Sequence, residues 1–179
     1  MDTLTGPAVA APEDAEAGDE LSVLLVDVGG LRCGIPAADV VELHPAVAVT
    51  PLPGAPAVVD GVIDVRGAIV AVLDLRARLG LPRREPLRSD HLVVARVGTR
   101  TVVLRVDRAR ALTAFPRSDM TEGEDLSRSH HVGGVARLAG GLVLIHDLAT
   151  FLSSEEAVVL DNALENLRPG PDAGQEGGR

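Results

Sequence analysis

The chain has 179 residues and a net charge of -9, with 46% hydrophobic, 24% charged and 1% aromatic residues. This length suits one domain or two closely packed half-domains, and the composition predicts a folded core of Val, Leu, Ile and Ala. An acidic surface repels nucleic-acid phosphates and anionic lipids, and the aromatic platforms that stack single-stranded bases are missing, so neither kind of partner is expected.

Both ends of the sequence are predicted to be tails without regular structure. Residues 1–20 are rich in Pro, Gly, Ala and acidic side chains, and residues 168–179 have a similar character. Such stretches cannot bury enough apolar surface to offset the entropy of ordering them. The sequence also lacks a signal peptide and any apolar run of about 18 residues, so we expect a cytoplasmic protein without membrane insertion.

Short apolar runs between turn residues predict strands through the first half of the folded part, residues 21–167. Gly29 and Gly30 would form a tight turn, because glycine adopts positive φ without steric cost. Pro51 and Pro53 interrupt the pattern, since proline lacks the N–H that a central strand needs. The expected strands are Leu21–Val28, Leu31–Ile35, Ala38–Leu43, Ala46–Thr50, Val62–Arg66 and Ala68–Leu75.

The second half repeats the hairpins of the first half. The endings agree as well, because Val-Leu-Asp-Leu at 72–75 matches Leu-Ile-His-Asp-Leu at 144–148. These matches indicate a pseudo-repeat of about 70 residues. Short strands at this spacing favour a mostly β protein of two small barrels with a groove between them. The expected strands here are His91–Val97, Arg100–Asp107, Val132–Leu138 and Leu142–Leu148.

One helix is predicted at the end of the folded part. Ser153 is a favoured N-cap residue, and Glu156, three residues later, completes a capping box. Apolar residues then recur at helical spacing, which predicts a helix docked on the barrels, because a short isolated helix is marginal in water. This apolar stripe consists of Val159, Leu160, Ala163, Leu164 and Leu167.

The sequence does not assemble a catalytic or metal-binding set. It has no nucleophile elbow and no phosphate-binding loop. Cys33 is the single cysteine, and we interpret it as a small buried hydrophobe, with a redox or small-ligand sensor as the alternative. We therefore expect no enzyme activity, no cofactor and no metal site. The histidines, none of which has the spacing of a metal motif, are His44, His91, His130, His131 and His146.

The segment Gly61–Gly67 is the strongest candidate for a binding feature. Side chains alternate between faces in an extended chain, so Asp64 and Arg66 would lie opposite to Ile63 and Val65. An arginine at a strand end, beside a glycine turn, presents a rigid fork of hydrogen-bond donors to a partner. A local ion pair between Asp64 and Arg66, without a function, fits the same residues, so both interpretations stay open.

Residues 61–80 read Gly-Val-Ile-Asp-Val-Arg-Gly-Ala-Ile-Val-Ala-Val-Leu-Asp-Leu-Arg-Ala-Arg-Leu-Gly. This run closely resembles the signature of CheW-like domains, which is roughly G-V-x-N-L-R-G-x-I-V-P-V-x-D-L-R-x-x-x-G. The first hairpin, the Val-Val-Glu-Leu segment at 40–43 and the junction before the last helix also resemble that family. Among the departures from the signature, Asp64 stands in place of the usual Asn and Ala71 in place of the usual Pro.

The resemblance implies a CheW-like domain over residues 21–167, built as two intertwined, SH3-like five-stranded β-barrels with a C-terminal helix. It implies a non-enzymatic adaptor in chemotaxis that bridges the cytoplasmic tips of methyl-accepting receptors and the regulatory domain of the histidine kinase CheA. Such an adaptor is cytoplasmic, is recruited to receptor arrays, and can meet other CheW-like domains there. A scaffold of a non-flagellar chemosensory pathway fits the same resemblance.

The resemblance also implies two binding surfaces. On the receptor side, apolar side chains would pack on the receptor helices while Arg66 fixes their register. The kinase side is assigned to Met120 and Thr121, within the segment 117–122. The predicted receptor-binding residues are Val40, Glu42, Gly61, Asp64, Arg66, His91 and Leu112.

Overall fold

The computed structural model describes residues 19–122 and 132–167. Most of the predicted tail at 1–20 and all of the tail at 168–179 lie outside the described residues, as do His130 and His131. Within the described parts, no helix has the length and apolar character that crossing a membrane would require.

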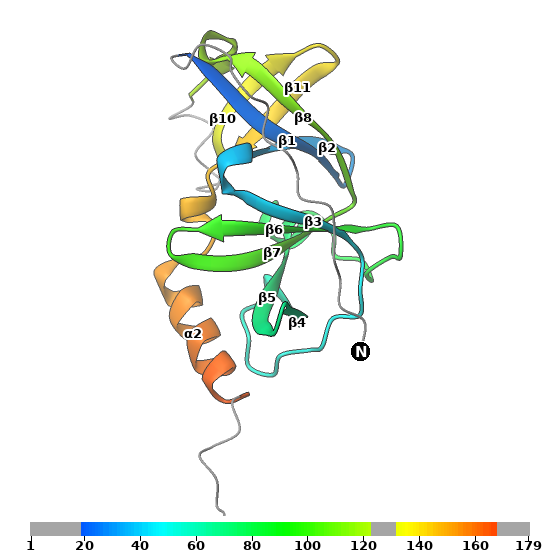
Figure 1. The fold of residues 1–179 in the computed structure, drawn as a ribbon, viewed down its shortest axis with the longest axis vertical. Coiled ribbons are helices and arrows are strands. Elements are labelled where there is room, and N and C mark those ends of the chain that lie inside the picture. The colour runs from blue at the N-terminus through cyan, green and yellow to red at the C-terminus, as the bar shows by residue number, and fades with distance from the viewer. Residues whose placement is uncertain (1–18, 123–131, 168–179) are drawn as a thin grey trace, which may run out of the picture.

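The described residues form a mostly β structure (Figure 1). Two α-helices, α1 (Leu75–Arg78) and α2 (Ser154–Glu165), accompany the strands. Three short 3-10 turns, at Ala37–Asp39, Arg117–Asp119 and Leu148–Thr150, lie at strand ends. The strands are β1 (Glu20–Val28), β2 (Leu31–Pro36), β3 (Val40–Pro45), β4 (Val59–Val65), β5 (Ala68–Asp74), β6 (His91–Val97), β7 (Arg100–Val106), β8 (Arg108–Pro116), β9 (Met120–Thr121), β10 (Val132–Leu138) and β11 (Gly141–His146).

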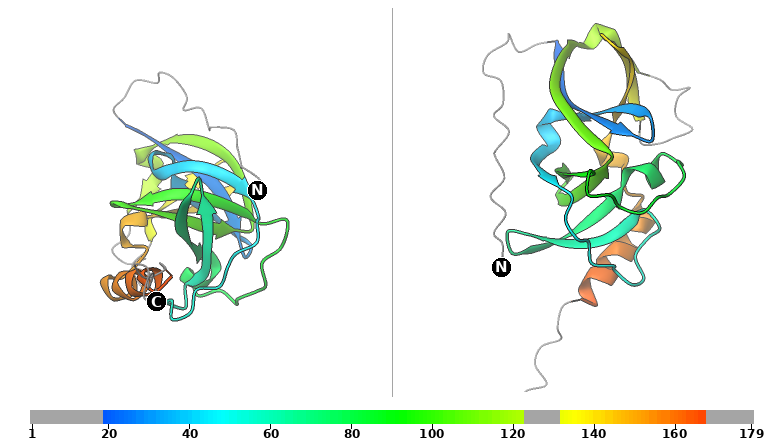
Figure 2. Two further views of the ribbon diagram at one scale, coloured as in Figure 1. Left: turned by 60° about the horizontal axis from the view of Figure 1, so that its bottom comes forward. Right: turned by 90° about the vertical axis from the view of Figure 1, so that its right-hand side faces the viewer.

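The strands form two curled sheets, and each sheet contains strands from both halves of the sequence. The first sheet has the order β8-β1-β2-β11-β10-β9, and the second has the order β3-β6-β7-β5-β4. The hairpin β1–β2 therefore lies beside β10–β11, and β6–β7 lies beside β4–β5, through the parallel pairs β2–β11 and β5–β7. Figure 2 shows the two sheets one above the other along the long axis. The predicted hairpin repeat is present, but each barrel combines strands from both halves.

The matching ends of the two repeats have the same local structure. The Asp74 carboxylate accepts a hydrogen bond from the Arg76 N–H at 2.9 Å and caps α1. The Asp147 carboxylate accepts from the Ala149 N–H at 2.9 Å and caps the 3-10 turn that follows β11. A carboxylate at this position satisfies a backbone donor that has no partner within the turn. The shared Asp-Leu ending is thus a repeated cap.

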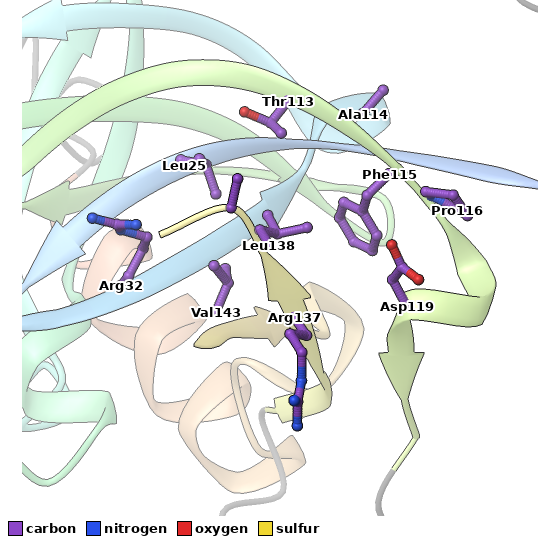
Figure 3. Close-up of a pocket in the computed structure, with 11 residues that line it drawn as sticks. Leu25, Arg32, Thr113, Ala114, Phe115, Pro116, Asp119, Arg137, Leu138 and Val143 are labelled. Carbon is purple, nitrogen blue, oxygen red and sulfur yellow. The ribbon is translucent and has the colours of Figure 1, made fainter. Parts of the chain in front are cut away.

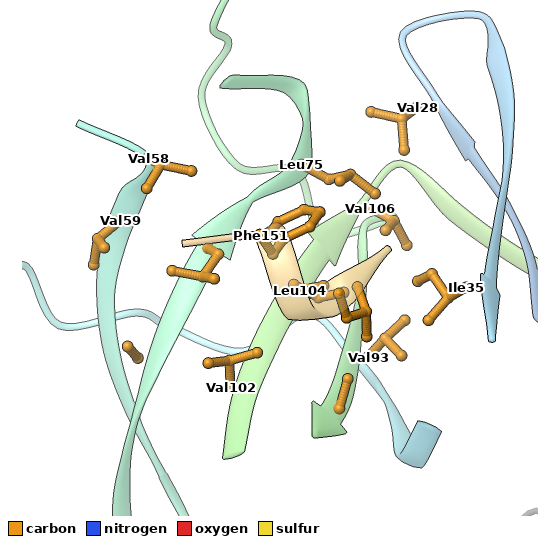
Figure 4. Packing of buried hydrophobic residues seen from close by; sticks show 14 of the residues in the cluster. Val28, Ile35, Val58, Val59, Leu75, Val93, Val102, Leu104, Val106 and Phe151 are labelled. Atoms are coloured by element: carbon orange, nitrogen blue, oxygen red, sulfur yellow. The ribbon is translucent and has the colours of Figure 1, made fainter. Parts of the chain in front are cut away.

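Three apolar clusters form the core. One fills the first barrel around Phe115, and another fills the second barrel around Val72 and Val103. The largest cluster joins the two barrels and packs α2 against them, with Phe151 fully buried in it (Figure 4). Aliphatic side chains supply nearly all of this core, and the chain's two aromatic residues, Phe115 and Phe151, are both buried. The two barrels therefore behave as one packed unit.

The helix α2 follows its prediction at the N-terminus. The Ser153 Oγ accepts a hydrogen bond from the Glu156 N–H at 3.1 Å, and the Glu156 carboxylate accepts from the Ser153 N–H at 2.9 Å. Leu160 and Ala163 are buried as expected. Val159 and Leu167, however, are each 43% exposed, so the buried stripe is narrower than the sequence predicted.

One predicted strand is wrong, and one long strand was missed. The segment Ala46–Thr50 is not a strand, and Thr50 makes an isolated bridge to Val62. Strand β8 was not predicted, although it pairs with most of β1. Smaller differences lie at strand ends, where Ala38 belongs to a 3-10 turn and Leu75 begins α1.

Buried charges connect the two barrels. The Arg105 side chain is nearly inaccessible and forms ion pairs with Asp60 at 2.5 Å, Asp74 at 2.9 Å and Asp90 at 3.5 Å. Such burial is tolerated because three carboxylates surround the guanidinium. Arg84 extends this charge network, since it binds Asp90 at 2.6 Å.

The charge network reaches the first barrel through Asp107. Its carboxylate binds Arg84 at 2.7 Å and Arg76 at 2.8 Å. It also accepts a hydrogen bond at 2.7 Å from the N–H of Gly29, in the turn between β1 and β2. The same cluster of charges therefore contacts the second barrel, the loop before β6 and the first hairpin.

Candidate functional site

The turn between β4 and β5 holds Arg66 in an uncommon backbone conformation. Val65 pairs with Ala68, so Arg66 and Gly67 form a two-residue loop, with φ angles of 54° and 86°. Positive φ at both positions is the requirement of a type I′ hairpin turn. Glycine adopts it freely, whereas an arginine there costs about 1–2 kcal/mol. A strained, exposed arginine kept at a hairpin tip points to a function.

An ion pair holds the strained arginine in place. The guanidinium of Arg66 lies 2.7 Å from Oε1 of Glu42, and the Arg66 side chain is 65% exposed while that of Glu42 is 11% exposed. Glu42 lies on β3 and Arg66 follows β4, and these are the two edge strands of the second sheet. The ion pair therefore connects the two edge strands of the second sheet. It also anchors the Arg66 guanidinium, although the Arg66 side chain faces solvent.

Asp64 stabilises the turn rather than the arginine. Its Oδ1 accepts a hydrogen bond of 2.6 Å from the N–H of Gly67. The proposed local ion pair between Asp64 and Arg66 is not what the geometry shows, because Arg66 binds Glu42 instead. An asparagine offers the same Oδ1 acceptor, which explains why an Asp fits this position of the signature.

His44 is a part of this site that the sequence interpretation missed. Its Nε2 lies 2.8 Å from the second carboxylate oxygen of Glu42, Oε2. The His44 side chain is 8% exposed. Glu42 and His44 are two residues apart on β3, and this spacing places them on one face of a strand. That i, i+2 spacing was the signal in the sequence that could have found the pair.

The other predicted receptor-binding residues differ in exposure. Val40 and Leu112 are half-buried and pack against the central cluster. His91 begins β6, is half-buried and pairs with Pro45. Gly61 is buried in a bulge of β4, where an added Cβ would lie 2.1 Å from the carbonyl oxygen of Thr50. Glu42, Asp64 and Arg66 thus meet at one hairpin end, while Gly61 serves the packing behind it.

One exposed apolar residue near the turn was also missed. Ile69 is 56% exposed and pairs directly with Asp64 across the β4–β5 hairpin. It therefore lies beside the arginine turn and offers an apolar contact next to a charged one. In the sequence, nothing distinguishes Ile69 from the buried residues of the same strand.

The predicted kinase-binding residues lie on an edge strand of the first sheet, whereas the Arg66 turn belongs to the second sheet. Met120 and Thr121 form β9, which pairs with β10, and Met120 packs on the interior of that barrel while Thr121 is exposed. A pocket of about 330 Å³ opens nearby, lined by Phe115, Asp119 and Arg137 among others (Figure 3). These residues form a surface separate from the arginine turn.

Cys33 has the properties of a core residue. It is fully buried in the central cluster. Burial, with a smaller contribution from the negative charge of Asp27, raises the pKa of its thiol to about 12. A thiol in this state is a poor nucleophile at neutral pH. In the part of the chain that the structure describes, no group of three or more His, Cys, Asp or Glu is placed to hold a metal ion.

Comparisons with known proteins agree with the fold and the signature. A family model of the CheW-like domain matches residues 22–156. Chemotaxis protein CheW of Rhizobium meliloti (strain 1021) is 34% identical over 110 residues, covering 60% of this chain and 71% of that protein. Protein FrzA of Myxococcus xanthus is 31% identical over 124 residues, covering 68% and 78%.

A solved structure shows the same fold. The scaffolding protein TtCheW from Thermoanaerobacter tengcongensis superposes with a TM-score of 0.71 at 20% identity, over 76% of this chain and 94% of that chain. At 20% identity this likeness supports the two-barrel fold. The assignment of the chain to a family rests on the family model and the curated relatives. The chain belongs to the CheW-like domain family and is a coupling protein of chemotaxis signalling.

Proposed function

We propose that this chain is a non-enzymatic adaptor that links the cytoplasmic tips of methyl-accepting chemotaxis receptors to the regulatory domain of the histidine kinase CheA. In this proposal it works in the cytoplasm at receptor arrays, where other CheW-like domains are further partners. Membership of the CheW-like family supports the role. The similarity to Protein FrzA is compatible with an output other than flagellar chemotaxis.

The Arg66 turn is the observation that carries the receptor side of the proposal. A guanidinium that is 65% exposed, yet anchored at one end by Glu42, keeps donors free for a partner. Its planar fork suits carboxylates on a receptor helix. Ile69 adds an exposed apolar contact beside it, and Val40 and Leu112 complete the proposed surface from the central cluster. Helices recognised in a groove need this combination of apolar contacts and a polar contact that fixes register.

The kinase side of the proposal uses the far edge of the first sheet. Among residues 19–122 and 132–167, strand β9 is the last strand of that sheet, so no described strand pairs with its outer side. Edge strands offer backbone groups to a partner, and Thr121 and Asp119 are exposed there. We assign Met120 and Thr121 to contacts with the kinase on this basis.

The experiment replaces Arg66 in a reconstituted complex of receptor-bearing membranes, CheA and this protein. Arg66→Asn removes the cation, and asparagine accepts the left-handed backbone conformation better than most residues. We expect receptor-dependent kinase activity to fall by about tenfold or more, which corresponds to losing one charge-assisted contact. Co-sedimentation with the receptor membranes should fall in parallel.

Arg88→Asn is the matched control, because Arg88 is exposed on the loop before β6. It should leave kinase activation and co-sedimentation unchanged. A thermal unfolding scan of both variants verifies that they fold like the original protein. If folded Arg66→Asn protein still couples receptor and kinase normally, the assignment of the receptor site to this turn is wrong.

A further inference from the structure

The carboxylate of Glu42 has two partners, one on each oxygen. Oε1 binds the guanidinium of Arg66 at 2.7 Å, and Oε2 binds Nε2 of His44 at 2.8 Å. Glu42 and His44 are both buried, at 8% and 7% exposure, whereas the Arg66 side chain is largely exposed. A buried imidazole and an exposed guanidinium therefore share one carboxylate.

The surroundings of this carboxylate are apolar. Glu42 pairs across the sheet with Val94, and His44 pairs with Leu92, and both partners belong to the apolar cluster inside the second barrel. A carboxylate in such surroundings is costly unless its oxygens are hydrogen-bonded. Changing either partner must therefore alter the position or the charge of Glu42.

The charged groups near the pair can be assigned element by element. Strand β3 contributes Glu42 and His44 themselves, and the β4–β5 turn contributes Arg66. Asp64, on β4, is engaged by the N–H of Gly67. At the start of β6, Asp90 binds Arg84 and Arg105, and the next residue is His91. The facing positions of β6 are Leu92 and Val94.

We propose, on the basis of the receptor-coupling function above, that His44 is a positioning residue for Arg66. The hydrogen bond from His44 fixes the plane of the Glu42 carboxylate, and this directs Oε1 at the turn. Arg66 is thereby held in its left-handed conformation with its free donors facing solvent. His44 itself does not touch the partner.

Two variants separate the hydrogen bond from the packing of the side chain. His44→Gln keeps a side-chain N–H donor, and His44→Leu has a similar volume and no donor. Each is measured for binding to a soluble cytoplasmic fragment of the receptor. His44→Gln should bind like the original protein, because it keeps the donor to Glu42. His44→Leu should bind about tenfold more weakly, as loss of a charge-assisted hydrogen bond implies.

A second measurement needs no receptor. The Nε–Hε group of Arg66 is followed by NMR relaxation in the free protein and in both variants. We expect it to be ordered in the original protein and in His44→Gln, and mobile in His44→Leu. Identical Arg66 dynamics in all three proteins would overturn the role of His44.

Receptor coupling and the role of His44 can fail separately. If the original protein does not bind the receptor fragment, the proposed function is wrong, and the NMR measurement still decides whether His44 positions Arg66. If the original protein binds, Arg66→Asn does not, and His44→Leu matches the original in affinity, then the receptor site stands and the inference about His44 is overturned. Thermal unfolding verifies that His44→Leu is folded.

Discussion

Gly61 shows how a single residue behind the site can affect it. Its φ is 152°, and a Cβ there would lie 2.1 Å from the carbonyl oxygen of Thr50, a backbone atom. That carbonyl accepts the Val62 N–H at 2.8 Å, so the two segments are already in close contact. Because backbone atoms cannot move aside locally, Gly61→Ala should lower the free energy of unfolding by about 3 kcal/mol. Urea denaturation measures the change.

Gly54→Ala is the control for this prediction. Gly54 has a φ of 77°, but nothing lies within 4 Å of the position that its Cβ would take. Its substitution should therefore cost about 1 kcal/mol, which is the conformational cost alone. Equal destabilisation by the two substitutions would show that the contact with Thr50 is not what requires glycine at position 61.

The main contact of the site could not be predicted from sequence. The sequence indicated that Arg66 is a functional residue, because it stands beside a glycine turn within a recognisable signature. A local ion pair with the nearest acid, Asp64, was the alternative that the sequence left open. The actual partner, Glu42, lies on a different strand, and it meets Arg66 because the barrel brings the two edges of its sheet together. A contact of that kind depends on the closed sheet and has no local signal.

At the scale of elements, α2 is held at its start by two kinds of contact. The capping box joins Ser153 and Glu156, and the Glu156 carboxylate also binds Arg78 of α1 at 2.8 Å. Burial opposes ionisation of Glu156, but the hydrogen bonds from Arg78 and Ser153 outweigh it and lower the pKa of that carboxyl. The N-terminus of α2 is therefore fixed to α1 as well as capped.

Removing the cap tests the contribution of this helix end. Ser153→Ala removes the hydroxyl that accepts from the Glu156 N–H, and we expect a loss of about 1 kcal/mol in the free energy of unfolding. Ser154→Ala, one residue later and exposed, should change it by less than about 0.5 kcal/mol. Chemical denaturation compares the two, and equal effects would contradict the capping role.

The elements that the sequence predicted well have local signals. The four hairpins with glycine turns and the capped helix depend on residues within a few positions of one another. Strand β8 was missed because it is partly exposed and is held in the sheet by its pairing with β1. Its sequence is Arg-Ala-Arg-Ala-Leu-Thr-Ala-Phe-Pro. The segment at 46–50 is apolar enough for a strand, but it packs its valines on the second barrel without joining the sheet.

At the scale of the whole molecule, the charge network around Arg105, Arg84 and Asp107 ties the barrels to each other. Burial by itself would raise the pKa of the Asp90 carboxyl, but hydrogen bonds from Arg84 and from the Leu87 N–H lower it below its ordinary value of 3.8. The pKa of Asp107 is lowered likewise, against burial, by the Gly29 N–H and by Arg76.

These lowered pKa values predict how stability depends on pH. A carboxyl whose pKa is lower in the folded state stabilises the protein above its unfolded pKa, and this contribution is lost as the pH falls through the folded value. The free energy of unfolding should therefore be nearly constant from about pH 7 to about pH 5 and fall below about pH 4. Urea denaturation at a series of pH values measures this profile.

Arg84→Met tests whether the network causes that profile. It leaves the buried Asp90 with one partner fewer, so it should cost about 3 kcal/mol at pH 7. The cost should be smaller in acid, because the carboxylate that has lost Arg84 takes up a proton more readily and is then no longer a buried unpaired charge. Arg110→Met is the control, since Arg110 binds Asp27 with its own side chain half-exposed, and it should cost less than about 1 kcal/mol. A cost for Arg84→Met that does not shrink in acid would contradict the explanation.

The central claim is that the receptor binds at the Arg66 turn. Methyl NMR of isoleucine, leucine and valine side chains, during titration with the soluble receptor fragment, locates the contact directly. The largest shifts are predicted at Val65, Ile69 and Leu112, around the turn and the central cluster, with Val158 on the exposed face of α2 unaffected. Shifts centred on α2 or on Leu142, with the methyl groups beside Arg66 unchanged, would contradict it.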